Sequence, residues 1–152
     1  MSDPIQFEGA TPRLAFPLLF SGQAQKEFFV NEALLRADLA VQCVVEGEAQ
    51  TPPPGPSAGQ AWLVGDEPGG LFVGHASAIA GWTGDGWRFV EALDGFRVFD
   101  RQSRCCRLYS GSWTLPSAAG EPVGGTTVDE QARAAIVALV ATLTEAGVLA
   151  PG

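Results

Sequence analysis

Few side chains of the sequence are suited to catalysis. His75 is the single histidine, so a nucleophilic triad or a multi-histidine metal site would have to include it. Its neighbours, Gly74 and Ser77 among them, predict a strand end or a turn. A structural histidine is the expected interpretation, and catalysis through His75 is the alternative.

Two further patterns resemble catalytic or binding motifs. Residues 65–70 (Gly-Asp-Glu-Pro-Gly-Gly) resemble a phosphate loop, but no Lys-Ser or Lys-Thr pair follows, and two acids stand where phosphate would bind. Paired carboxylates hydrolyse glycosides, yet Asp85, Glu91, Asp94 and Asp100 mostly lie beside glycines or at predicted strand ends, where acidic residues are typical of turns. We expect no enzyme, no cofactor and no metal, and keep a hydrolase as a third hypothesis.

Aromatic residues suggest a different chemistry. The candidates for stacking on sugar rings are Trp82, Trp87, Tyr109 and Trp113, which flank two glycine turns. The competing interpretation is that these side chains pack across neighbouring strands and stabilise a small sheet.

Charge and cysteine content exclude several classes of partner. The formal net charge is −8, and the nine basic residues are scattered, so neither a nucleic-acid backbone nor an anionic membrane surface is an expected partner. Three cysteines, two of them adjacent, form no disulfide or zinc pattern. The start Met-Ser-Asp-Pro has no basic region before an apolar run, and the apolar runs 14–20 and 134–143 are too short to cross a bilayer. We expect synthesis in the bacterial cytoplasm and no membrane insertion.

An N-terminal arm, residues 1–30, is apolar but contains Pro12 and Pro17, which prevent a continuous helix. Such a segment must cover either the core of its own subunit or the surface of another one, and both alternatives stay open. If it docks on another chain, its candidate contacts are Leu14, Phe16, Leu18, Leu19 and Phe20.

Residues 31–50 are predicted to contain a helix that begins at the N-cap Asn31 and continues to about Val45. Beside its broad apolar face, Leu35, Leu39 and Cys43 form a second apolar stripe with a spacing of four residues. Because a monomer needs only one apolar face, this stripe predicts contact with another subunit.

Residues 51–116 are predicted to form an antiparallel β-unit after a proline-rich linker, with the strong hairpin turn Thr83-Gly84-Asp85-Gly86. The strands are expected at 61–64, 71–73, 78–82, 87–92, 96–100, 105–109 and 112–115.

Residues 117–152 are expected to hold a linker and a C-terminal oligomerisation helix. The stretch Thr127-Val128-Asp129-Glu130 is a capping box. Four residues, Ala132, Ile136, Leu139 and Leu143, have coiled-coil spacing, which an amphipathic helix on its own domain would also show. The predicted fold class is α+β: an extended arm, one helix, a small antiparallel β-unit of aromatic hairpins and a C-terminal amphipathic helix.

Several motifs resemble one domain family of unassigned function. The motifs are Thr-Pro-Arg-Leu-Ala-Phe-Pro-Leu-Leu at 11–19, Gly-Gln-Ala-Gln-Lys-Glu at 22–27, Asn-Glu-Ala-Leu at 31–34, Gly-Gln-Ala-Trp-Leu-Val at 59–64, the Gly-His segment at 74–80 and the closing helix from 128. That family occurs in prophage and gene-transfer-agent clusters of alphaproteobacteria, and the resemblance covers nearly the whole chain.

The resemblance implies a structural component of a phage-like particle or gene transfer agent, in a head spike or tail fibre, with no catalytic residues. The partners expected from this are copies of the chain, as a trimer or pentamer, and other capsid, spike or tail proteins, in a particle that is released from the cell. The alternative is a carbohydrate-binding module that recognises cell-surface polysaccharide through exposed aromatic residues.

Overall fold

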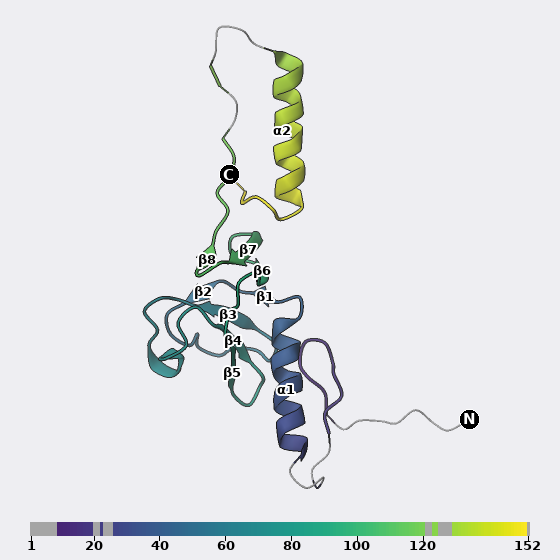
Figure 1. The fold of residues 1–152 in the computed structure, drawn as a ribbon, viewed down its shortest axis with the longest axis vertical. Coiled ribbons are helices and arrows are strands. Elements are labelled where there is room, and N and C mark those ends of the chain that lie inside the picture. The colour runs from purple at the N-terminus through teal and green to yellow at the C-terminus, as the bar shows by residue number, and fades with distance from the viewer. Residues whose placement is uncertain (1–8, 20–21, 23–25, 121–122, 125–128, 152) are drawn as a thin grey trace, which may run out of the picture. The chain divides into compact units, whose positions relative to one another are not determined.

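The computed structural model describes residues 9–19, 22, 26–120, 123–124 and 129–151, and its fold is α+β, as the sequence predicts. Among these residues, two α-helices and eight short strands are distributed over two compact units, Met1–Ala92 and Leu93–Gly152 (Figure 1). The boundary between the units falls inside the predicted β-unit 51–116, which the structure therefore divides.

Helix α1 spans Lys26–Ala40 and belongs to the first unit. Asn31 is not its N-cap. It lies within the helix, where its side-chain amide accepts from the Leu19 amide at 2.8 Å and donates to the Leu19 carbonyl at 3.0 Å. The predicted end of the helix is also wrong, because α1 stops at Ala40, the chain turns at Gln42, with φ of 44°, and it continues as strand β1, Val44–Val45.

The first unit contains a mixed four-stranded sheet in the order β2-β3-β4-β5. Its strands are β2 (Glu48–Ala49), β3 (Ala61–Val64), β4 (Ile79–Trp82) and β5 (Trp87–Val90). Strand β2 is parallel to β3, and the other two pairs are antiparallel. The strand predicted at 71–73 is instead a 3-10 helix, η1 (Gly70–Phe72), which begins at Gly70 with φ of 59°. Strand β5 is a terminal strand of this sheet.

The two faces of this sheet are covered by different elements. On one face Phe72 of η1 packs with Val64 and Ala80, and Trp87 and Phe89 contact the same cluster. On the other face α1 lies against β4 and β5 (Figure 1). The helix and η1 thus enclose strand β4 between them, while β5 lies at the margin.

The second unit contains strands β6 (Arg97–Asp100), β7 (Cys105–Tyr109) and β8 (Trp113–Thr114), paired antiparallel in that order, and helix α2 (Glu130–Glu145). Asp129 is the N-cap of α2, since its side chain accepts a hydrogen bond from the Ala132 amide at 2.9 Å. Thr127, the predicted cap, lies outside the described residues. Beyond the helix Gly147 has φ of 70°, as expected for a stop residue.

Candidate functional site

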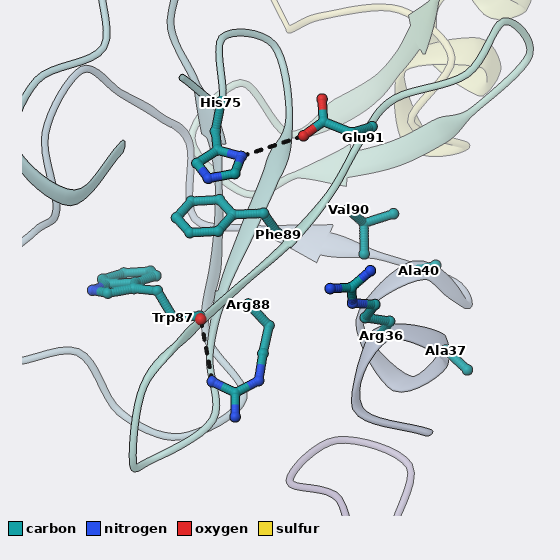
Figure 2. Close-up of a pocket in the computed structure, with 9 residues that line it drawn as sticks. All are labelled: Arg36, Ala37, Ala40, His75, Trp87, Arg88, Phe89, Val90 and Glu91. Atoms are coloured by element: carbon teal, nitrogen blue, oxygen red, sulfur yellow. Dashed lines mark hydrogen bonds and ion pairs between the residues drawn. The ribbon is translucent and has the colours of Figure 1, made fainter. Parts of the chain in front are cut away.

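A groove with a volume of about 580 Å³ lies between α1 and the terminal strand β5 of the first unit. Figure 2 shows its lining, in which Arg36 of α1 lies near Val90 of β5, while Trp87 and Phe89 extend to the other side of the strand. The lining residues are Arg36, Ala37 and Ala40 from α1, His75 from the loop after η1, and the continuous run Trp87, Arg88, Phe89, Val90 and Glu91. Because both faces of β5 contribute, the groove follows the edge of the strand.

Two arginines supply the positive charge of this groove. Arg36 Nε donates to Glu32 Oε1 at 3.0 Å, and Arg88 Nε donates to Glu32 Oε2 at 2.8 Å. Within the described residues the Arg36 side chain makes no other hydrogen bond or ion pair, and it is 60% exposed. The terminal nitrogens of Arg36 are therefore available to a carboxylate or another acceptor.

Aromatic rings line the opposite side of the groove. The imidazole of His75 is stacked on Phe89, with centroids 3.8 Å apart and planes at 2°. Its Nδ1 lies 3.3 Å from Glu91 Oε1, a contact drawn in Figure 2. His75 thus lies between the Phe89 ring and the Glu91 carboxylate. Among the described residues, no group of three or more His, Cys, Asp or Glu side chains is arranged to hold a metal ion.

The four aromatic residues proposed for glycan stacking lie in two separate pairs. Trp82 and Trp87 face each other across β4 and β5 in the first unit, at 5.4 Å and 61°. Tyr109 and Trp113 form a similar pair across β7 and β8 in the second unit, at 5.2 Å and 64°. All four are half-buried. Each pair packs across neighbouring strands, which is the interpretation that competes with sugar binding. Of the four residues, Trp87 alone lines the groove.

The oligomerisation stripe predicted on the first helix is mostly internal. Leu39 is 5% exposed and Cys43 is 3% exposed, and Cys43 lies beyond the end of α1. Burial raises the pKa of the Cys43 thiol to about 11, although the nearby charge of Arg13 opposes this. Leu35 is half-buried. Leu39 and Cys43 are therefore buried within their own unit: Leu39 packs on Gly81 of β4, and Cys43 is not part of the helix.

Helix α2 carries the other predicted stripe, and none of its residues is buried. The exposed fractions are 45% for Ile136 and 59% for Leu139, while Ala132 is exposed and Leu143 is half-buried. Residues 134–143 contain no charged side chain. The structure thus presents a largely exposed, uncharged helix surface at residues 134–143.

Residues 9–19 of the N-terminal arm are folded back on their own unit, and we call this segment the strap. Residues 26–30, which were predicted to belong to the extended arm, instead form the start of α1. The Thr11 amide donates to the Phe16 carbonyl and the Leu18 amide to the Gly9 carbonyl, each at 2.9 Å. Asp38 of α1 accepts hydrogen bonds from the Thr11 hydroxyl at 2.8 Å and the Arg13 amide at 3.0 Å.

The candidate docking residues of the arm therefore sit on a strap whose backbone is held by α1. Leu14 is 41% exposed, whereas Phe16, Leu18 and Leu19 are half-buried. Phe20 lies outside the described residues. Their contact with another protein stays a prediction.

The sequence analysis did not predict one exposed apolar pair at the start of α1. Phe28 and Phe29, in the first turn of α1, are 69% and 73% exposed and touch edge to face at 5.7 Å. Two adjacent phenylalanines close to a helix start were the available signal, because adjacent helical residues cannot both face one core.

Comparison with known proteins identifies the family. Residues 30–114 match a family described as a protein of unknown function, DUF2793. The matched region includes α1 from Val30 onward and the strands of both units. The chain belongs to this family. No curated protein and no solved structure matches it. None of the helices in the described residues has the length and apolar character needed to cross a membrane.

Proposed function

We propose that the chain is a non-enzymatic structural subunit that works as a homo-oligomer, a trimer or a pentamer, with α2 as its main self-association element. The observation that carries this proposal is the exposed, uncharged surface of residues 134–143 on α2. A helix that is apolar around most of its circumference is normally buried, and a bundle of identical helices buries it efficiently.

The particle in which this subunit acts is proposed from the motifs quoted above. The segments 11–19, 22–27 and 59–64 resemble proteins of prophage and gene-transfer-agent clusters. In this proposal the subunit forms part of a head spike or tail fibre, binds other capsid, spike or tail proteins, and leaves the cell in the particle. Electron micrographs of particles with and without the protein test this step, and identical particles would refute it.

Self-association is tested on the full chain by analytical ultracentrifugation. We expect Leu139→Glu to shift the protein towards monomer, because it places a carboxylate in the predicted helix interface. Gln131→Glu is the matched control, since Gln131 is an exposed polar residue of the same helix outside residues 134–143. A wild-type chain that sediments as a monomer at all concentrations, or equal effects of the two variants, would count against the proposal.

A further inference from the structure

The groove beside β5 has the geometry of a site for strand addition. Strand β5 ends the sheet, and hydrogen-bonding groups on such an edge pair readily with an extended peptide. The wall opposite the edge is α1, at Arg36, Ala37 and Ala40. A groove between an edge strand and a helix accepts a peptide that lies parallel to both.

The outward-facing amides of β5 lie at the required positions, while the outward-facing carbonyl of Trp87 accepts a hydrogen bond from Arg88 Nη1 of the same strand at 3.2 Å. Thr83 N donates to Gly86 O at 3.0 Å, which marks that pair as hydrogen-bonded. Hydrogen-bonded and non-bonded pairs alternate in an antiparallel ladder, so Arg88 and Val90 bond to β4, while the amides of Trp87 and Phe89 point outward. In agreement, the amide of Trp82, opposite Trp87, donates away from β5 to Gln60 O at 2.9 Å.

The two sides of the groove differ in chemistry. On one side are Arg36 and Arg88, and on the other are the rings of Trp87, Phe89 and His75. Because side chains of an added strand point alternately to the two sides, the fitting peptide alternates polar or acidic residues with apolar ones.

This chain itself contains such a segment. Ile5, Gln6, Phe7 and Glu8 alternate apolar and polar side chains and end in a carboxylate. They lie outside the described residues, immediately before the strap. With Ile5 and Phe7 on the aromatic side, Gln6 and Glu8 fall on the side of Arg36.

We infer that the groove binds residues 5–8 of a second copy of the chain as an added strand on β5, with Glu8 paired to Arg36. This inference deepens the proposed homo-oligomer and rests on it. It gives residues 5–8 of the arm a contact with a second subunit, and it gives the subunits a directional link beside the contact through α2.

The test is a charge swap in the full chain, with the association constant measured by analytical ultracentrifugation at low salt. Arg36→Glu and Glu8→Arg should each weaken association roughly tenfold, and the double variant should recover most of that loss. Arg97→Glu is the control, because Arg97 is an exposed arginine of the second unit, on β6. Single variants that associate as the wild type does, or a double variant no better than either single one, would overturn the inference.

Hydrogen exchange gives a second readout. The amides of Trp87 and Phe89 should become protected at concentrations at which the chain associates, and Glu8→Arg should remove the protection. Protection that persists in the monomer would mean that the segment binds its own copy, which overturns the inference. Quenching of tryptophan fluorescence by polysaccharide, lost in Arg36→Glu, would also overturn it in favour of a sugar ligand.

The two proposals fail differently. A chain that never associates refutes the homo-oligomer and with it the strand addition. A chain that associates through α2, is disrupted by Leu139→Glu and ignores the charge swap refutes the strand addition alone.

Discussion

The side chain of Leu39 occupies the space directly above Gly81. A β-carbon placed on residue 81 would lie 2.6 Å from Leu39 Cδ1 and 2.9 Å from Cδ2. Leu39 is buried in α1, and residue 81 is buried in β4. The absence of a side chain at Gly81 therefore lets α1 approach the sheet and fixes the helix wall of the groove.

We predict that Gly81→Ala destabilises the first unit by about 1–3 kcal/mol, as overpacking of a buried contact usually does. The measurement is urea unfolding followed by circular dichroism. Gly120→Ala is the control, because a β-carbon there meets no atom within 4 Å and its backbone has no positive φ. Equal stability of the two variants would show that α1 can move away at little cost.

The strap should depend on Asp38. This buried carboxylate accepts from the Thr11 hydroxyl and from the amides of Arg13 and Leu14, the last at 2.6 Å. In addition, the Arg13 guanidinium donates to the carbonyl of Leu39, in the last turn of α1, at 3.1 Å and to that of Gln42, just after the helix, at 2.8 Å. One acid and one arginine thus tie the strap to the C-terminal end of the helix.

We expect Asp38→Ala to cost about 1–3 kcal/mol, because it leaves buried donors without an acceptor. It should also expose the strap to protease within residues 9–19, detected by mass spectrometry of the first fragments. Asp66→Ala, a change at an exposed turn residue, should leave the cleavage rate unchanged. Equal cleavage of the Asp38→Ala variant and the wild type would contradict the role given to this carboxylate.

The α+β class and most strands of the β-region could be predicted, because alternation and glycine turns are local signals. The ends of the first helix could not. Asn31 has the chemistry of an N-cap, but in the structure it binds the backbone of Leu19, a contact between segments that no local pattern reveals. Val44 and Val45 continued the helical pattern, yet they form a strand, since tertiary pairing can override local preference.

The candidate site was only partly visible in the sequence. The sequence shows the stripe of Leu35, Leu39 and Cys43, but the burial of Leu39 between α1 and β4 depends on a glycine far away in the chain, Gly81. The groove was missed for a related reason. Arg36 and Arg88 meet at one acid, Glu32, only after α1 has packed on β5.

The three cysteines should differ strongly in reactivity. Cys106 is exposed, whereas Cys43 and Cys105 are buried. Since the pKa of Cys43 is raised to about 11 by burial, this thiol is almost entirely protonated at pH 8 and is a poor nucleophile. We expect a single fast-reacting thiol with a disulfide reagent in the folded chain. Cys106→Ser should remove the fast phase, and a fast phase that survives this substitution would contradict the burial of the other two.

The second unit should lose stability in acid through the pair of Asp100 and Arg107. Asp100 is fully buried on β6, and its Oδ2 lies 2.6 Å from Arg107 Nη2 and 2.7 Å from Nε. Burial raises the pKa of Asp100, but hydrogen bonds from Arg107 and Ser103 lower it by more, so that the pKa lies below its usual value. The carboxylate therefore stabilises the fold above its unfolded pKa, near 4, and this contribution is lost as the pH falls through the folded pKa.

We predict that Asp100→Asn destabilises the second unit by about 3–5 kcal/mol at pH 7, since it breaks a buried ion pair on one side only. The difference from the wild type should shrink as the pH falls below about 4, because the unfolded wild-type chain then takes up a proton that the folded carboxylate binds only at lower pH. Urea unfolding at pH 7, 5 and 3 measures both effects. Asp94→Asn, a change to an exposed acid of the same unit, is the control and should show a small difference at every pH. A difference for Asp100→Asn that stays constant down to pH 3 would mean that the lost stability comes from packing rather than from the charge.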